Sequence, residues 1–236
     1  MFTLFFVTDL PITVGESYEF ANEDANHAIR VLHTKVGDDF MLSDGNGWWS
    51  QVKATEINKK SIRVEVISSG YQDALATTIT VVQALPKGDR AKEAIELLTE
   101  AGVDRIVPWA AARSIGKSSA KFGITAREAS KQSRRFRIPE VTDVANTAQI
   151  CEAIKLSDLA IAFHESATHK LSDQISSHNV GHLLIIIGPE GGITDEELAT
   201  FEAAGAKVAL LGRPILRSAH AGIAAVSAIS ALLKVW

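Results

Sequence analysis

From Thr77 onward, the chain contains short runs of consecutive apolar residues, and this pattern limits its fold more than any other feature. Helix-forming segments separate the runs, which read TITVVQAL, RIVPWAA, LAIAF, HLLIIIG and KVALLG. A strand with one solvated face alternates apolar and polar residues, whereas a strand of a parallel sheet is covered on both faces and is apolar throughout. The pattern therefore predicts an α/β domain built on a buried parallel sheet.

The residues before this point follow a different pattern, in which short β-type runs alternate with turn signals. Asp44-Gly45-Asn46-Gly47 lies between two such runs and supplies the positive-φ residues that a hairpin needs. This part indicates a small β-barrel or sandwich. The polar stretch 68–73 is the predicted boundary, which gives one domain at 1–72 and a second at 73–236.

A short helix is predicted in the first domain, within EDANHAIRVLH. Ala25, Ile29 and Leu32 fall on one helical face, with Val31 beside them. We expect this face to cover one end of the barrel.

Three helix starts are predicted in the second domain. Asp89 can cap the helix RAKEAIELLTEA, and Thr125–Glu128 and Thr194–Glu197 both have the spacing of a capping box.

Basic residues are concentrated in one segment, although the whole chain has a formal net charge of −4. Residues 113–137 contain eight Lys and Arg residues, Lys117 and Lys121 among them, against Glu128 alone. The alternative is a solvent-exposed helix face with no binding role. Such faces usually carry both positive and negative residues, so phosphate binding is favoured. The residues predicted to contact phosphates are Arg30, Lys87, Arg90, Arg113, Arg127, Lys131, Arg134, Arg135 and Arg137.

Cysteine content and the N-terminal sequence indicate the compartment. Cys151 is the single cysteine, so neither an intramolecular disulfide nor a cysteine-rich metal site is expected. The apolar N-terminus MFTLFFVTDL is short and has no basic flank, which supports neither a signal peptide nor a membrane span. We expect a cytoplasmic protein without a membrane partner.

Two glycine-containing loops follow apolar runs in the C-terminal third. The first, Gly188-Pro189-Glu190-Gly191-Gly192, ends a strand and precedes a capped helix, and the second lies in ALLGRPILRSAHAG. The carboxyl edge of an open α/β sheet is where ligands bind, and glycine lets the backbone approach them. The alternatives are a plain strand-to-helix turn and, for Arg213 and Arg217, solvated turn charges.

Several other ligand classes are disfavoured by the motifs. The chain has neither GxxxxGK[ST] nor a GxGxxG after a strand, which argues against nucleoside triphosphates and dinucleotides. His164 and His169 are five residues apart and fall on different helix faces, so a zinc site is not expected. Apolar backbone-lined walls suit an adenine ring and a thioether, while an arginine suits a carboxylate or a developing anion.

The chain resembles the RsmE-type members of the SPOUT (α/β-knot) RNA methyltransferases over nearly its whole length. The residues that carry the resemblance are NHAIRVLHTKVGD, QALPKGDRAKEAIELLTEAGVDRIVPW, QSRRFRIPEV, IGPEGGITDEEL and LLGRPILRSAHA. The resemblance implies an N-terminal PUA-like β-barrel that helps to hold RNA and a C-terminal parallel-sheet domain with a deep trefoil knot. It also implies a homodimer that methylates N3 of a uridine in 16S ribosomal RNA of the small subunit.

The same resemblance implies the site residues. S-adenosyl-L-methionine is expected to bind at Glu165, Ile187, Gly188, Pro189, Glu190, Gly191, Leu211, Gly212, Ile215 and Leu216. Arg217 and Ser218 are the predicted catalytic residues, because an arginine can stabilise a uridine anion and a polar neighbour such as Ser218, His220 or Glu190 can relay a proton. No metal is expected.

One segment departs from the family pattern. Where the family usually reads LGPRILRTETA, this chain exchanges a proline and an arginine and has Ser218-Ala219-His220. The acidic side chain of the triplet is therefore missing. Two other functions stay open on the sequence: methylation of another RNA target, a 2′-hydroxyl or a different base, and RNA binding without catalysis by an assembly factor. A small-molecule enzyme is a third, less favoured one.

Overall fold

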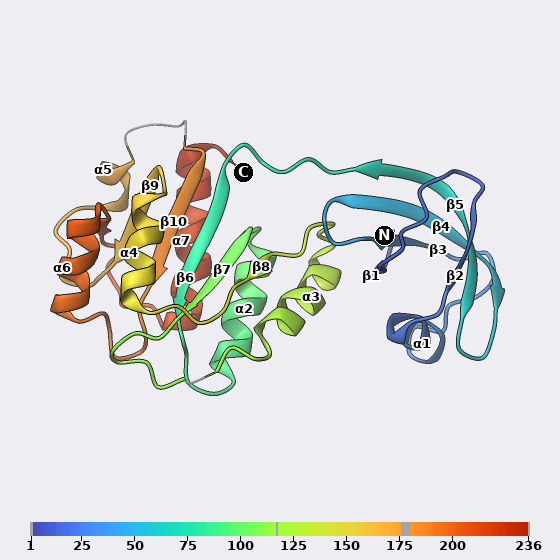
Figure 1. Ribbon diagram of the computed structural model, residues 1–236, viewed down its shortest axis with the longest axis horizontal. Helices are drawn as coiled ribbons and strands as arrows, with labels where there is room; N and C mark the ends of the chain where they lie inside the picture. The colour runs from blue at the N-terminus through green and yellow to red at the C-terminus, as the bar shows by residue number, and fades with distance from the viewer. Residues whose placement is uncertain (1, 117, 176–179, 236) are drawn as a thin grey trace. The chain divides into compact units, whose positions relative to one another are not determined.

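The computed structural model describes residues 2–116, 118–175 and 180–235, shown in Figure 1. The chain forms two compact units. One extends to Ala74 and also includes Ser130–Ile138, and the other holds Leu75–Ala129 and the chain from Pro139 onward. The return of Ser130–Ile138 to the N-terminal unit was not predicted, and the predicted boundary after residue 72 stays a prediction.

The N-terminal unit is built on a curled, five-stranded half-barrel. Its strands lie in the order β1 (Leu4–Phe6), β3 (Asp39–Ser43), β4 (Trp48–Ile57), β5 (Ile62–Tyr71) and β2 (Ser17–Phe20). All neighbouring pairs are antiparallel except β1 and β3. The predicted hairpin is confirmed, because Gly45 and Gly47 have φ values of 79° and 110° between β3 and β4.

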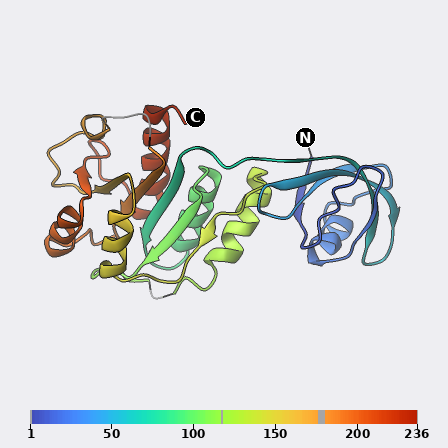
Figure 2. The same cartoon turned by 45° about the horizontal axis from the view of Figure 1, so that its top comes forward.

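Helix α1 (Glu23–Arg30) belongs to the same unit, and in Figure 2 the strands curve past it. Asn22 caps the helix by accepting a hydrogen bond from the Ala25 N–H at 3.1 Å. The helix ends before Val31 and Leu32, which are 59% and 45% exposed. The prediction that Leu32 shares a buried helical face with Ala25 was therefore wrong, because the helix is one turn too short to carry it inward.

The C-terminal unit contains a six-stranded sheet in which every pair is parallel. The order is β11 (Lys207–Ala209), β9 (Leu159–Phe163), β10 (His182–Ile187), β6 (Thr78–Ala84), β7 (Arg105–Trp109) and β8 (Glu140–Val141). Five of these strands correspond to the five apolar runs, so the predicted parallel sheet is confirmed. The edge strand β8 has only two residues, which is too short to give a hydrophobic pattern.

Helices cover both faces of this sheet, which explains why its strands are apolar throughout (Figure 1). Along β10, Leu183, Ile185 and Ile187 pack into the core under α2 (Arg90–Glu100) and α7 (Ser218–Leu233). The alternate residues Leu184 and Ile186 pack on the opposite side with α4 (Thr147–Lys155) and α6 (Asp195–Ala204). The remaining helices are α3 (Phe122–Ser133) and the short α5 (Leu171–Gln174). Within the described residues, no helix is long and apolar enough to cross a membrane.

The three predicted helix starts have different outcomes. The Thr194 capping box is present in full, with the Thr194 hydroxyl accepting from the Glu197 N–H at 3.2 Å. Asp89 stands before α2, but its backbone is already helical and its side chain makes no cap hydrogen bond. The Thr125 capping box was wrong, because α3 begins at Phe122 and Thr125 lies inside its first turn.

Candidate cofactor pocket and active site

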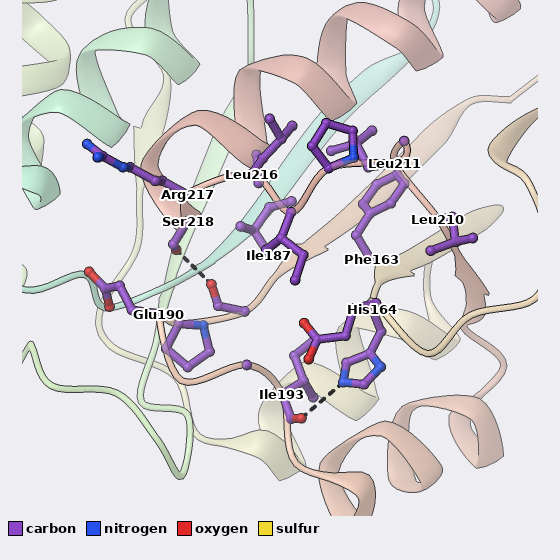
Figure 3. A pocket seen from close by; sticks show the side chains of 18 of the residues that line it. Phe163, His164, Ile187, Glu190, Ile193, Leu210, Leu211, Leu216, Arg217 and Ser218 are labelled. Atoms are coloured by element: carbon purple, nitrogen blue, oxygen red, sulfur yellow. Dashed lines mark hydrogen bonds between the residues drawn. The ribbon is translucent and has the colours of Figure 1, made fainter.

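A cavity of about 560 Å³ lies at the carboxyl edge of the parallel sheet in the C-terminal unit. Three loops line it. They follow the neighbouring strands β9, β10 and β11, and the third loop leads into the first turn of α7. Figure 3 shows side chains from all three loops around this cavity. Both predicted glycine loops therefore reach the same cavity, since the carboxyl ends of parallel strands meet at one edge.

Nine of the ten residues predicted to bind the cofactor line this cavity, as do the two predicted catalytic residues. They are Glu165, Ile187, Gly188, Pro189, Glu190, Leu211, Gly212, Ile215, Leu216, Arg217 and Ser218. Phe163, Ile193 and Leu210 also line it and were missed by the sequence reasoning. Phe163 is the last residue of the run LAIAF, and Leu210 immediately precedes the predicted Leu211, so attention to the carboxyl end of each run could have found both.

Gly191 is the predicted residue that does not line the cavity. Its carbonyl accepts a hydrogen bond from Arg113 Nη1 at 2.9 Å, and a Cβ built on it would lie 3.1 Å from Arg113 Cβ. Gly188 has a different constraint, because a Cβ there would lie 2.7 Å from Ile193 Cγ1. The first loop can therefore fold back over the end of β10 only with a glycine at position 188.

Ser218 is the most tightly held polar residue of the cavity. It is only 6% exposed, and its hydroxyl donates to the Gly188 carbonyl at 2.7 Å. The same oxygen accepts from Gln83 Nε2 at 3.0 Å, and Gln83 on β6 is fully buried. A serine hydroxyl has a single proton, and here Gly188 receives it. The geometry therefore favours an anchoring role for Ser218, because the residue joins the first loop to α7 and β6.

Gln83 was not predicted as a site residue. Its Nε2 also donates to the Ala84 carbonyl at 3.1 Å, while its Oε1 has no hydrogen-bond partner in the described part of the chain. The residue belongs to an apolar run, and nothing in the local sequence connects it with Ser218, which is 135 positions away.

Arg217 and Glu190 present charged side chains at the same side of the cavity (Figure 3). Arg217 is exposed and immediately precedes α7. The Glu190 side chain is only 19% exposed, and its Oε1 accepts from the Lys87 backbone N–H at 3.1 Å. Arg90 Nη1 lies 4.0 Å from the same oxygen. Lys87, which precedes α2, and Arg90, its first residue, therefore hold the Glu190 carboxylate in place.

Two histidines near the cavity are occupied by other contacts. His164 lies within reach of Ser166 Oγ at 2.7 Å through Nδ1 and of the Ile193 carbonyl at 3.3 Å through Nε2. His220 does not line the cavity, and its Nε2 lies 3.0 Å from Glu93 Oε1 on α2.

The residues predicted to bind RNA lie in both units, and the structure gives some of them internal partners. In the N-terminal unit, Lys131 Nζ forms an ion pair of 2.7 Å with Asp24, and the two side chains are only 12% and 10% exposed. Arg137 donates to the Tyr71 hydroxyl at 2.6 Å and to the Gln72 carbonyl at 2.9 Å.

In the C-terminal unit, Arg127 is paired with Glu128 at 3.3 Å. The predicted RNA-binding residues with exposed positions are Arg30, Lys87, Arg90, Arg113 and Arg134, and Arg135 is half-buried. Lys117 lies outside the described residues.

Comparison with known proteins agrees with this arrangement. A family model described as the RNA methyltransferase domain matches residues 73–230, and one described as the RNA methyltransferase PUA domain matches residues 20–67. The chain is 34% identical to the ribosomal RNA small subunit methyltransferase E of Mycobacterium tuberculosis, with 99% of this chain and 93% of the relative covered. It is 28% identical to the Bacillus subtilis protein of the same name, with 95% and 93% covered.

Solved structures give the same result. A ribosomal RNA small subunit methyltransferase E from Neisseria gonorrhoeae, bound to S-adenosyl methionine, has a TM-score of 0.87 at 25% identity, with 98% of each chain covered. A probable rRNA-methyltransferase from Porphyromonas gingivalis has a TM-score of 0.83 at 27% identity, with 99% of each covered.

A PUA-type half-barrel followed by a parallel sheet with a cavity at its carboxyl edge defines a two-domain RNA methyltransferase. Within that class, the chain belongs to the ribosomal RNA small subunit methyltransferase E (RsmE) family of S-adenosylmethionine-dependent enzymes. The predicted fold class, family and cofactor are thereby confirmed.

Proposed function

We propose that this protein transfers a methyl group from S-adenosylmethionine to N3 of a uridine in 16S ribosomal RNA of the small subunit. The observation that carries the proposal is the convergence of three strand-end loops on one cavity, in a chain 34% identical to a named small-subunit methyltransferase. The relatives share this architecture over almost their whole length.

The cavity has the chemistry that the cofactor requires. Ile187, Leu211 and Leu216 form an apolar wall, and Gly188 brings the backbone to the cavity edge. Such a wall suits an adenine ring and a thioether, and backbone N–H and C=O groups suit polar adenine atoms. When bound, the cofactor supplies an electrophilic methyl group.

The residues of this chain position the reactants and manage charge. Ser218 fixes the first loop by its hydrogen bond to Gly188, so that the loop needs little reorganisation when the cofactor binds. Arg217 projects at the charged side of the cavity and stabilises negative charge that develops on the uridine ring. We therefore assign Arg217 to catalysis, and Ser218 to positioning instead of the catalytic role expected from the sequence.

The remaining assignments belong to the same proposal. RNA binds through the exposed basic residues of both domains, the boundary between the domains follows residue 72 in the sequence, and the C-terminal domain is knotted. The protein acts in the cytoplasm as a homodimer. The apolar residues exposed near the cavity, Ile215 at 80% and Leu216 at 39%, support burial by a bound cofactor or a second subunit.

One experiment tests the reaction. The purified protein is incubated with labelled S-adenosylmethionine and small subunits that lack the modification, and the modified nucleotide is mapped by mass spectrometry. N3-methyluridine in 16S RNA is expected. A 2′-O-methyl group or another modified base would contradict the proposed target, and the absence of single-turnover methylation would favour an RNA-binding assembly factor.

A further inference from the structure

We propose that the Glu190 carboxylate is the group that accepts the N3 proton of the target uridine, and that Lys87 and Arg90 position it. This inference rests on the proposed function, since it concerns the same reaction. An imide nitrogen carries a hydrogen and becomes a useful nucleophile only when that proton leaves. The methyltransferase therefore needs a proton acceptor beside its charge-stabilising arginine.

Glu190 is held in place as a proton acceptor must be. Its Oε1 accepts from the Lys87 N–H at 3.1 Å and lies 4.0 Å from Arg90 Nη1. Its Oε2 makes no hydrogen bond within the described residues, which leaves this oxygen for a substrate. The side chain is 19% exposed, lines the cavity, and lies on the same side as Arg217 in Figure 3.

The other polar side chains near Arg217 are less suited to this task. Ser218 donates its only hydroxyl proton to the Gly188 carbonyl and already accepts from Gln83. His220 lies outside the cavity lining and is bound to Glu93. Both ring nitrogens of His164 have partners, and His164 lies on the far side of the view from Arg217 (Figure 3).

The proposed step balances in atoms and charge. The N3–H bond breaks and its proton passes to the Glu190 carboxylate. The electron pair left on N3 forms the new bond to the methyl carbon, and the carbon–sulfur bond breaks with its electron pair remaining on sulfur. Arg217 offsets the negative charge that spreads over the uridine carbonyl oxygens during proton removal.

The decisive variant is Glu190→Gln. Its amide oxygen can still accept from the Lys87 N–H, so the loop keeps its shape, but an amide cannot take the proton. The single-turnover rate near pH 7 should fall about 100-fold or more. The affinity for S-adenosylmethionine, measured by calorimetry, should stay within about threefold, because Gln preserves the loop contact.

The pH dependence separates proton transfer from a structural role. As pH rises from about 7 to about 9, uridine N3 ionises increasingly in solution and the missing acceptor matters less. The ratio of wild-type to Glu190→Gln rates should therefore decrease steadily with pH. Glu96→Gln is the matched control: it removes a half-buried carboxylate outside the cavity that pairs with Lys92 on α2, and its ratio should stay near one at every pH.

Two results would overturn the inference while leaving the proposed function intact. One is a wild-type enzyme that makes N3-methyluridine together with a Glu190→Gln variant of equal rate. The other is a reduced rate whose ratio to wild type does not change with pH, which indicates a positioning role only. A wild-type enzyme that makes no N3-methyluridine would overturn the proposed function itself, and this inference with it.

Discussion

Replacing Ser218 with alanine should loosen the first loop, residues 188–192, and the size of the effect follows from the two hydrogen bonds that are lost. The hydroxyl donates to the Gly188 carbonyl at 2.7 Å and accepts from Gln83 Nε2 at 3.0 Å, at a position only 6% exposed. A protein hydrogen bond contributes about 1 kcal/mol net, and leaving a buried partner unsatisfied costs about 1–3 kcal/mol. Gln83 Nε2 keeps its bond to Ala84, so most of the cost falls on Gly188. We expect a loss of about 2–3 kcal/mol in the free energy of unfolding of the C-terminal unit.

Denaturant unfolding and calorimetry with S-adenosylmethionine measure the two consequences. In the variant, the cofactor must order the loosened loop when it binds. If this ordering costs about 1.4 kcal/mol, the cofactor Kd rises about tenfold. Ser227→Ala is the matched control, because Ser227 lies on the same helix and, within the described chain, its hydroxyl bonds only back to the Ile223 carbonyl at 2.8 Å. Equal stability and equal affinity in the two variants would refute the anchoring argument. A Ser218→Ala enzyme that binds the cofactor normally but turns over slowly would restore the catalytic role predicted from the sequence.

Three further predictions concern other residues. Lys131→Met and Asp24→Asn, combined in a double-mutant cycle, should give a coupling energy of about 1–3 kcal/mol in unfolding, because the pair is 2.7 Å long and largely buried; a value near zero would contradict this. Arg217→Ala should lower turnover by about 10²–10³-fold with nearly unchanged cofactor affinity, and equal activity would remove the residue from the mechanism. Burial raises the pKa of the Cys151 thiol above its usual 9.0. A raised folded-state pKa gives a stabilisation that is present below the unfolded value and is lost as pH rises through the folded one, so wild type should lose stability above about pH 9 faster than Cys151→Ala. Parallel stability curves would oppose that reading.

The fold was predictable where burial acts on consecutive residues. In β10, alternate side chains enter the two cores on opposite faces of the sheet, so both must be apolar and the run is visible in the sequence. The edge strand β8 escapes this rule because its two residues, Glu140 and Val141, are exposed and half-buried. The α3 start was missed for a related reason: a Thr–Glu spacing marks a possible cap, but tertiary packing of the buried Phe122 places the helix start four residues upstream of the predicted Ala126.

The sequence predicted which loops line the cavity, but it was a much poorer guide to the roles of individual side chains. The glycine loops lie in the sequence beside the strands that position them. The roles of Ser218, Glu190 and Lys131, in contrast, depend on partners 135, 103 and 107 positions away. Positive charge in 113–137 favoured phosphate binding by this segment, yet Lys131 forms an ion pair within the N-terminal unit with Asp24 of α1. Composition can show that charge is concentrated, but only the fold shows which charged side chains are paired within the protein.

The Ser218-Ala219-His220 segment departs from the family pattern, and its contacts in this structure explain what each of its residues does. Ser218 retains the hydroxyl that anchors the first loop, and this contact needs no acidic neighbour. Ala219 is only 2% exposed, so an acidic residue here would bury a carboxylate, and alanine avoids that cost. His220 does not line the cavity and instead contacts Glu93, so its polar contact joins α7 to α2. The departures at 218–220 therefore fall on contacts that support the first loop and α7, while Arg217 and Glu190 line the cavity.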